Sequence, residues 1–266
     1  MAMIMGSLFL LSSYADVPDR PFVWVDDENF KPLIYRDETG ASKGIFYEVI
    51  TEAFRRMNIP LKNRLYPWSR AQKIVLEGGA DGMVTVYTRG RRRRFKATDP
   101  IVTVKEHVFT DKENPKFEKI LDIRSLKELK HFILVDTVDA GWSRENLKGM
   151  HVIWVPTAES ALNMIATGRA DIYLMSNFTG PYLIKEQIEK NSPYKKGLEN
   201  IVTGRYPIAK MDYRLLIRKD SPYVNIIDRF NATLRRMRRD GTYQKIIDRY
   251  KIDLEYRPTE KKDRKR

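Results

Sequence analysis

Residues 44–87 read GIFYEVITEAFRRMNIPLKNRLYPWSRAQKIVLEGGADGMVTVY, and this stretch decides the fold class. Apolar residues in its first part recur at the spacing of one helix face, namely Ile45, Val49, Ile50 and Phe54. The strand-like runs 61–66 and 82–87 flank a second helical stretch, residues 69–79, which ends in a Gly-Gly pair. Strand and helix therefore alternate, and this alternation predicts an α/β sheet with parallel strands.

The same alternation returns further along the chain. After an apolar crossing segment, residues 100–110, residues 125–136 predict a helix followed by a strand, and the pattern continues to residue 175. Residues 212–220 predict a strand, and the helix after it has Ser221 as its N-cap residue and Pro222 at its first position. Two α/β units joined by extended segments predict a cleft between them, at the ends of the strands, where such sheets bind small molecules.

Two residue types that carry much enzyme chemistry are scarce. The chain has no Cys, which excludes disulfides, thiolate metal sites, iron–sulfur ligation and a cysteine nucleophile. Its three His residues, His107, His131 and His151, lack the spacing of zinc-binding motifs. We therefore expect neither a metal site nor a cofactor, and we expect polar chemistry from Arg, Asp, Ser, Thr and aromatic side chains.

Two short segments hold much of the formal net charge of +14. Residues 89–94 include five Arg, and residues 257–266 carry six basic and two acidic side chains. A nucleic-acid site would need basic residues along one face with aromatic residues between them, and the sequence contains no such motif. We therefore expect no nucleic-acid partner, and we interpret residues 257–266 as a solvated basic tail.

The beginning of the chain is apolar. Residues 2–11 read AMIMGSLFLL, and Ser13-Tyr14-Ala15 follows shortly after. This run is shorter than the roughly 20 residues that cross a bilayer. It is typical of a signal peptide remnant over residues 1–15, although the positive charges that usually precede the apolar run are absent. The alternative is a truncated or misassigned start whose apolar residues pack as a strand.

Four strings of sequence carry a resemblance to a known family. Residues 28–54 hold an aromatic residue, a Pro and a Gly turn before a helix; residues 67–101 hold Pro-Trp-x-Arg-Ala, Gly-x-x-Asp-Gly and a Tyr-Thr-x-x-Arg loop. Residues 167–177 hold a Gly-Arg-x-Asp strand, and residues 238–252 hold a closing Asp-Gly-Thr-Tyr-x-Lys-Ile helix. Together they resemble the family 3 extracellular solute-binding proteins, which have the type 2 periplasmic binding protein fold and serve ABC transporters for polar amino acids.

This resemblance implies two Rossmann-like lobes joined by a hinge. Lobe 1 would be discontinuous and comprise residues 16–104 and 206–256. Lobe 2, residues 105–205, would be inserted between these two parts, so the chain would cross twice between the lobes.

The resemblance also implies a carboxylate-binding loop in lobe 1. In the family, an Arg in the Thr-x-x-Arg loop pairs with the ligand's carboxylate, and the matching residue is Arg91. Tyr87 and Thr88 lie in the same loop, where Thr88 would stabilise the loop or offer its hydroxyl. Val84 and Val86 precede the loop and could offer only backbone N–H groups. Charge alone does not separate Arg91 from a solvated Arg cluster.

Four further candidates belong to lobe 1. Asp27 and Phe30 follow the first predicted strand, where the family has an Asp and an aromatic residue facing the ligand. Phe30 would stack on the ligand or belong to the core. Trp68 would wall the cleft or fill the core. Arg70, in the same helical turn, would face the cleft or pair with a carboxylate.

Lobe 2 departs from the family pattern. Amino-acid binders of this family usually hold the ligand's ammonium group with an acidic residue just after the Gly-Arg-x-Asp strand, and Ser176 and Asn177 occupy that place here. Either the ligand lacks an ammonium group, or Asp139 or Asp27 takes the role. Asp139 and Ala140 lie in a loop that resembles a ligand-binding loop of the second lobe, and a helix N-cap is the alternative role for Asp139.

The resemblance implies a non-catalytic periplasmic receptor that acts as a monomer. It would capture a small carboxylate-bearing solute, an amino acid or a derivative, between its lobes and deliver it to a membrane ABC permease. One alternative is a lyase on the same fold, with Asp27 or Asp139 as the acid or base. A second alternative is a sensor domain of a membrane kinase or cyclase, which would need a transmembrane helix.

Overall fold

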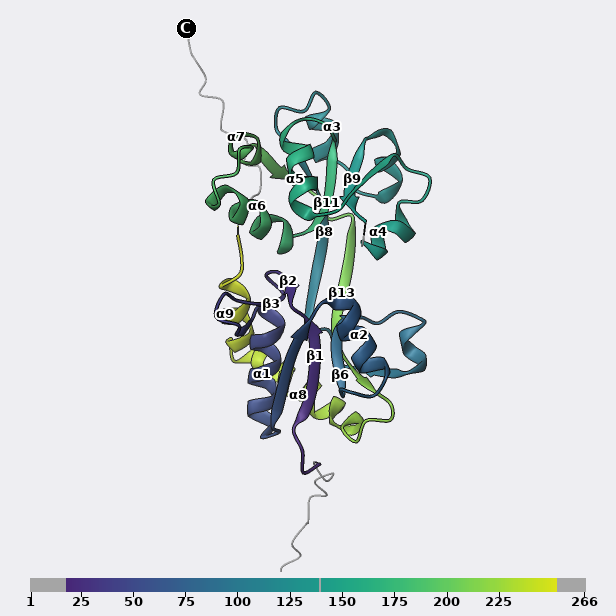
Figure 1. Cartoon of the computed structure of the whole chain (residues 1–266), viewed down its shortest axis with the longest axis vertical. Helices are drawn as coiled ribbons and strands as arrows, with labels where there is room; N and C mark the ends of the chain where they lie inside the picture. The colour runs from purple at the N-terminus through teal and green to yellow at the C-terminus, as the bar shows by residue number, and fades with distance from the viewer. Residues whose placement is uncertain (1–17, 139, 253–266) are drawn as a thin grey trace, which may run out of the picture.

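Two lobes, joined by two long strands, make up the part of the chain that the computed structural model describes, residues 18–138 and 140–252 (Figure 1). The joining strands, β8 (Val102–Asp111) and β13 (Ala209–Arg218), run from one lobe into the other and pair antiparallel. This confirms the predicted α/β class with two joined lobes. The lobe boundaries at 104/105 and 205/206 stay predictions. The expected signal peptide, residues 1–15, and the basic tail, residues 257–266, lie outside the described residues.

One sheet runs through both lobes in the order β10-β9-β11-β8-β13-β6-β1-β5, with β12 beside β8 and β7 beside β13. Strand β1 pairs parallel with β5 and β6, and β9 pairs parallel with β10 and β11. The remaining strands of this sheet are β1 (Phe22–Asp27), β5 (Leu61–Tyr66), β6 (Gly82–Val86), β7 (Phe95–Ala97), β9 (Leu134–Thr137), β10 (Val152–Val155), β11 (Ile172–Ser176) and β12 (Ile201–Thr203). A small second sheet holds β2 (Asn29–Phe30), β3 (Ile34–Arg36) and β4 (Ser42–Lys43).

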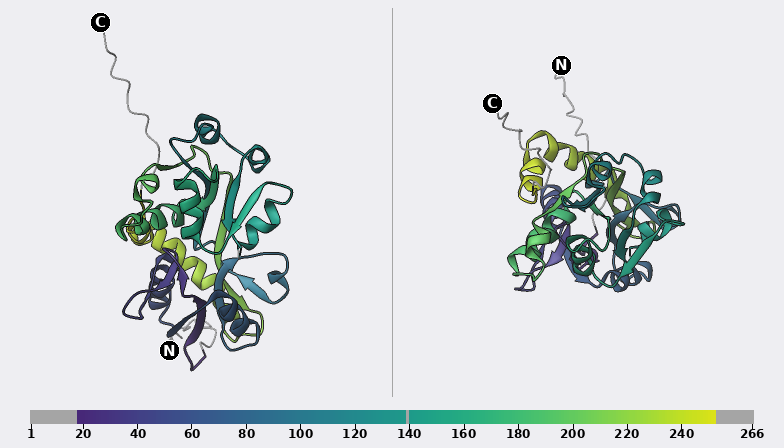
Figure 2. Two further views of the ribbon diagram at one scale, coloured as in Figure 1. Left: turned by 45° about the horizontal axis from the view of Figure 1, so that its top comes forward. Right: turned by 90° about the horizontal axis from the view of Figure 1, so that it is seen from above.

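Helices cover both faces of the sheet in each lobe (Figures 1 and 2). In lobe 1 they are α1 (Ile45–Met57), α2 (Trp68–Leu76), α8 (Ile227–Arg239) and α9 (Thr242–Asp248). In lobe 2 they are α3 (Phe117–Leu121), α4 (Gly141–Asn146), α5 (Ala158–Ala166), α6 (Thr179–Glu189) and α7 (Lys195–Leu198). Successive side chains of β1 point to opposite faces, so Phe22 and Trp24 pack with α1 and α8, whereas Val25 packs with α2.

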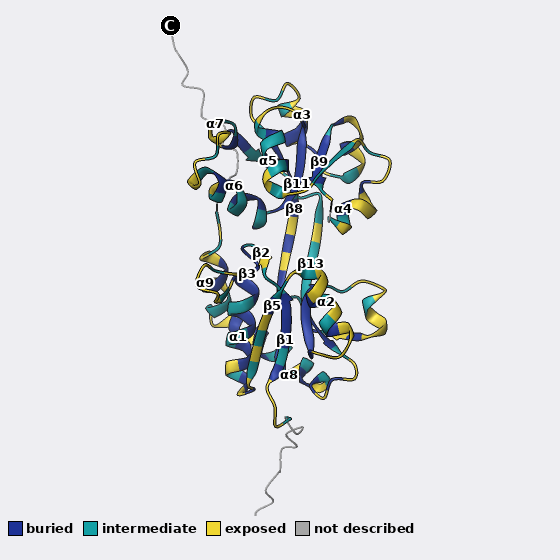
Figure 3. Cartoon of the chain, in the orientation of Figure 1, coloured by how far each residue is buried: buried dark blue, intermediate teal, exposed yellow. Residues whose placement is uncertain are grey.

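Helix α1 shows why this sequence folds as it does. Its apolar side chains at helical spacing are buried against β1, and the stripe is visible in Figure 3. Gly44 precedes the helix with a φ of 112°, and a Cβ atom at this position would lie 2.6 Å from the carbonyl oxygen of Leu33. Only glycine fits this close approach without strain. Asn58 ends the helix in the left-handed conformation that Asn tolerates.

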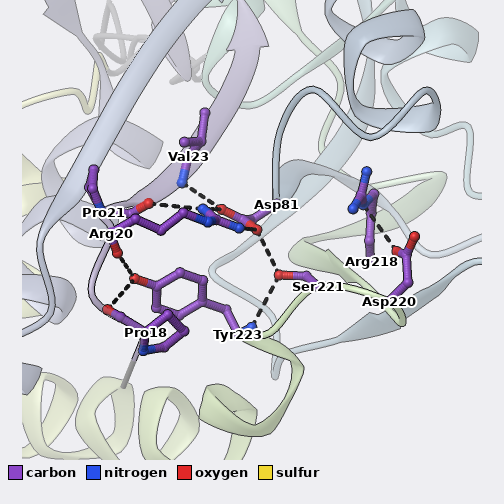
Figure 4. Close-up of polar contacts among 9 residues, drawn as sticks. All are labelled: Pro18, Arg20, Pro21, Val23, Asp81, Arg218, Asp220, Ser221 and Tyr223. Carbon is purple, nitrogen blue, oxygen red and sulfur yellow. Dashed lines mark hydrogen bonds and ion pairs between the residues drawn. The ribbon is translucent and has the colours of Figure 1, made fainter. Parts of the chain in front are cut away.

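Two of the helix predictions were wrong in detail. Residues 126–131 form a 3-10 helix, and α8 begins at Ile227 after a 3-10 turn over Val224–Ile226, so Ser221 is not its N-cap residue. The hydroxyl of Ser221 instead donates to Asp81 Oδ1 at 2.7 Å (Figure 4). The Ser221 hydroxyl, which the local sequence assigned to helix capping, is therefore used in a tertiary contact with the buried carboxylate of Asp81.

Asp81 ties together distant parts of lobe 1. Its carboxylate accepts two hydrogen bonds from Arg20, each at 2.6 Å, and one from the Val23 N–H at 2.8 Å (Figure 4). With Ser221, these contacts connect the start of β1, the segment before β6 and the segment after β13. One buried carboxylate, which is 1% exposed, thus makes hydrogen bonds to both separate parts of lobe 1.

Candidate functional site

A small polar cavity lies at the ends of two lobe 1 strands, next to the crossing strand β13. Its volume is about 180 Å³. Seven residues line it: Asp26, Asp27, Phe30, Trp68, Val84, Thr85 and Tyr213. Because β1 and β6 are parallel neighbours, their carboxyl ends meet at one edge of the sheet, where α/β proteins bind ligands. The cavity is smaller than the roughly 300 Å³ at which drug-sized sites begin, and so it suits a small solute.

Two larger hollows, of about 460 and 360 Å³, lie on the outer surface of lobe 1. The first is lined mainly by exposed Arg side chains of the single helix α8, and the second lies between α1 and α9. Neither is at the ends of the parallel strands. The small cavity is therefore the candidate site.

Arg91 holds its guanidinium beside the cavity. Nη1 donates to Thr85 Oγ1 and to the Val86 carbonyl, and Nη2 donates to Gln72 Oε1, all at 2.9 Å. The guanidinium lies 5.9 Å from the centroid of the Trp68 ring. Burial lowers the pKa of Arg91, and no carboxylate of the described residues offsets this effect. A partly buried cation held by neutral acceptors, with N–H donors left over, can bind an anion.

Asp26 lines the cavity and has its hydrogen bonds satisfied within lobe 1. Its carboxylate accepts from Trp24 Nε1 at 2.7 Å, from the Val84 N–H at 2.8 Å and from the Asp27 N–H at 2.9 Å. Burial raises the pKa of Asp26 to about 7, even though the three donors lower it. This carboxyl group shapes the cavity and uses the Val84 N–H that we expected to face a ligand.

Tyr213 lies within the electrostatic influence of the charged groups of the site. Its ring lies 5.7 Å from that of Phe30. Burial raises the pKa of Tyr213, the charges of Glu106 and Asp26 raise it further, and the charge of Arg91 lowers it. The phenol therefore lies within electrostatic reach of one cation and two carboxyl groups, and among the described residues its hydroxyl has no hydrogen-bond partner.

The structure places four predicted residues at the cavity: Asp27, Phe30, Trp68 and Val84 line it. Asp27 accepts a hydrogen bond from the Asn29 N–H at 3.0 Å, and Trp68 begins α2. Arg70, in contrast, is exposed and lies over the Tyr66 ring, 4.8 Å from its centroid. Arg70 is thus directed to a neighbouring aromatic ring rather than to the cavity.

The loop that carries Arg91 is held by its own residues. The hydroxyl of Thr88 accepts from the Arg91 N–H at 3.4 Å, and the Tyr87 hydroxyl donates to the Phe95 carbonyl at 3.0 Å. The Val86 carbonyl accepts from the Thr88 N–H at 3.1 Å as well as from Arg91. Thr88, Tyr87 and Val86 thus support the loop, and their contact with a ligand stays a prediction.

The predicted lobe 2 residues make contacts within lobe 2. Ser176 Oγ accepts from the Thr179 N–H at 3.0 Å, at the start of α6. Asn177 Oδ1 accepts from the Lys105 N–H at 2.8 Å, so it binds the crossing strand. Ala140 precedes α4. Asp139 lies outside the described residues.

A carboxylate that we did not predict lies directly beside Ser176. Glu106 of β8 is opposite Ser176 in the antiparallel register of β8 and β11, and it is 6% exposed. Burial and then the nearby carboxylate of Asp136, at the end of β9, raise the pKa of Glu106 to about 7. Lobe 2 therefore does hold a buried acid beside Ser176, on the neighbouring strand.

Sequence reasoning missed Asp26, Glu106, Thr85, Gln72 and Tyr213. A signal existed for two of them. Period-two alternation from Trp24 places Asp26 on the buried face of its strand, and alternation along β8 buries Glu106 together with its valine neighbours. Gln72 and Tyr213 meet the site only through tertiary packing.

No group of three or more potential metal-ligating side chains occurs within the described ranges 18–138 and 140–252. Across the same ranges, every helix is too short or too polar to cross a membrane.

Two α/β lobes, two crossing strands and a small polar cavity at the strand ends define a two-lobed ligand-binding protein of the type 2 periplasmic binding protein fold. The sequence profile of the bacterial extracellular solute-binding proteins, family 3, matches residues 23–253. The chain belongs to this family. A comparison with curated protein sequences returned no significant match.

Solved structures share the fold. A histidine kinase sensor domain with similarity to periplasmic binding proteins has a TM-score of 0.68 and 22% identity, with 89% of this chain and 98% of that chain covered. Substrate binding domain 2 of GlnP from Lactococcus lactis has a TM-score of 0.62 and 21% identity, with 88% and 96% covered. A mutant of ArgBP from T. maritima has a TM-score of 0.63 and 18% identity, with 86% and 94% covered.

Proposed function

We propose that this protein is an exported receptor that captures a small carboxylate-bearing solute, an amino acid or a derivative, between its lobes and presents it to a membrane ABC permease. The observation that carries the proposal is the burial and hydrogen bonding of the Arg91 guanidinium. Its guanidinium is partly buried beside the cavity, is held by three neutral acceptors, and lacks a carboxylate partner among the described residues. A ligand carboxylate would supply the missing opposite charge.

The connection between the lobes supports capture by closure. The crossing strands β8 and β13 are paired with each other, so one lobe can rotate about this pair as a hinge. A ligand that contacts both lobes would favour the closed state by its extra contacts there. Family membership supports export and solute binding, and the names of the GlnP and ArgBP neighbours support the amino-acid class.

A thermal-shift screen tests this proposal. The probes are the 20 standard L-amino acids and a set of small mono- and dicarboxylates, each with the purified protein. A true ligand at about 100 times its dissociation constant adds about 2.7 kcal/mol to the free energy of unfolding. We expect at least one carboxylate to raise the unfolding temperature. A screen in which neutral and cationic solutes stabilise the protein and no carboxylate does would contradict the proposal.

A second candidate is a lyase that acts on a small carboxylate. The observation in its favour is that two carboxyl groups, those of Asp26 and Glu106, lie within electrostatic reach of Tyr213. Each has its pKa raised to about 7. Groups that titrate near neutral pH suit general acid and base catalysis. Incubating each stabilising solute with the protein and following it by NMR separates the two candidates: a receptor leaves the solute unchanged, and a lyase converts it.

A further inference from the structure

Glu106 is a buried carboxylate whose negative charge has no positively charged partner among the described residues. It is 6% exposed, and its side chain makes no hydrogen bond or ion pair within the described part of the chain. The charged group that acts on it is another carboxylate, Asp136 of β9, which repels it. Buried carboxylates in folded proteins are normally paired or hydrogen-bonded. Within residues 18–138 and 140–252, no positively charged group therefore offsets the charge of Glu106.

The position of Glu106 relates this missing cation to the candidate site. Glu106 lies on the crossing strand β8, between Ser176 of β11 and Ala209 of β13 in the strand register. Its charge acts on Tyr213, which lines the cavity, and so does the charge of Arg91. Tyr213 thus lies within electrostatic reach of a lobe 1 cation and of a crossing-strand carboxylate, neither of which has an ion-pair partner in the described part of the chain.

The other polar side chains that could accept a positively charged ligand group are already engaged in hydrogen bonds within the protein. The hydroxyl of Ser176 is engaged at the start of α6, and the amide oxygen of Asn177 is bound to the Lys105 N–H. Asp26 accepts three hydrogen bonds from lobe 1. Glu106 alone among these four groups has its full hydrogen-bonding capacity available.

We propose that Glu106 receives the ammonium group of a zwitterionic ligand whose carboxylate is held by Arg91. The ligand class is then a small α-amino acid or a related amino carboxylate, and a carboxylate without the amine binds more weakly. This assignment rests on the proposed function of the site. It moves the anionic contact from the position after β11 to the crossing strand β8.

The test compares two ligands on three proteins. The ligands are the L-amino acid that stabilises the parent most and its deamino analogue, in which a hydrogen replaces the ammonium group. We expect Glu106→Gln to weaken the amino acid at least tenfold by calorimetric titration and to change the deamino analogue less than twofold. Asp27→Asn, which removes another carboxylate of the cavity, should leave the ratio of the two affinities unchanged. An unchanged ratio in Glu106→Gln, or a collapsed ratio in Asp27→Asn, overturns the assignment.

A second measurement uses the parent protein and so does not depend on the folding of a variant. The titratable groups around Glu106 are Asp136 from β9 and Tyr213 from β13, while Ser176 from β11 is uncharged. An ammonium group beside Glu106 stabilises its charged form, so binding near pH 7 should release protons into the buffer. Calorimetry in two buffers of different ionisation enthalpy should therefore give greater proton release for the amino acid than for its deamino analogue. Equal release contradicts the role of Glu106.

The outcomes separate this inference from the proposed function. If Arg91→Ala binds both ligands as tightly as the parent does, the proposed function fails. If both ligands depend on Arg91 while their ratio is insensitive to Glu106→Gln, only the ammonium assignment fails.

Discussion

Lys31 of lobe 1 and Glu186 of lobe 2 form an ion pair, with Nζ 2.6 Å from Oε1. Lys31 lies in the turn between β2 and β3, and Glu186 lies in α6. Next to this pair, the rings of Tyr35 and Tyr182 are 6.3 Å apart, and Phe178 packs into the core of lobe 1. These five residues form an interlobe clasp, which holds the lobes together at a second place besides the crossing strands.

We predict that Lys31→Ala shifts the unliganded protein towards an open state. The pair is partly buried and should contribute about 1 kcal/mol, equivalent to roughly a fivefold change in the open-to-closed equilibrium. Small-angle X-ray scattering should give a larger radius of gyration for Lys31→Ala, and ligand affinity should fall a few-fold. The matched control is Lys185→Ala, because among the described residues Lys185 pairs with Glu189 of its own helix and with no residue of lobe 1. A radius of gyration equal to that of the control would show that the clasp does not affect the opening and closing of the lobes.

We expect Asp81→Asn to destabilise lobe 1. The substitution removes the charge that Arg20, the Val23 N–H and Ser221 share, at a cost of about 1.5–3 kcal/mol in the free energy of unfolding. Urea denaturation measures this difference. Asp220→Asn is the control, since Asp220 is 78% exposed in its pair with Arg218 and should change stability by less than about 0.5 kcal/mol (Figure 4). Equal effects of the two substitutions would contradict the role of Asp81.

Stability without ligand should fall as the pH rises from about 4 to about 7. Asp26 and Glu106 have pKa values raised to about 7, mainly by burial, so over this range the folded protein binds more protons than the unfolded chain. The cost of ionising them is complete above pH 7. We expect a lower unfolding temperature at pH 8 than at pH 5.5, and a smaller difference in Glu106→Gln. A pH profile that the variant leaves unchanged would show that Glu106 ionises in the folded protein as it does in the unfolded chain.

The fold could be predicted from the sequence because its signals are local. The helical spacing of apolar residues before Asn58 and the Gly-Gly end of the next helix lie within single elements. The start of α8 could not be predicted in the same way, because the Ser221-Pro222 pair is a good local cap and only the tertiary contact with Asp81 overrides it.

The candidate site could be predicted only in part. Arg91 stands out from its Arg neighbours by a family motif, and the structure adds the reason: its guanidinium turns inward to Thr85 and Gln72 while the neighbours stay exposed. Glu106 was not predicted, because it lies outside the four strings that carry the family resemblance. Its burial follows from strand alternation, but its missing partner appears only once β8 is placed beside β11 and β13.

The affinity of Arg91→Ala for the best-stabilising carboxylate tests the central claim most directly. We predict that calorimetric titration gives a loss of several kcal/mol in binding free energy for Arg91→Ala and partial recovery in Arg91→Lys, because an ammonium cannot match the forked geometry of a guanidinium. Arg92→Ala, which removes an exposed neighbour from the same loop, should bind like the parent. An affinity of Arg91→Ala equal to that of the parent and of Arg92→Ala would contradict the claim that Arg91 anchors the ligand's carboxylate.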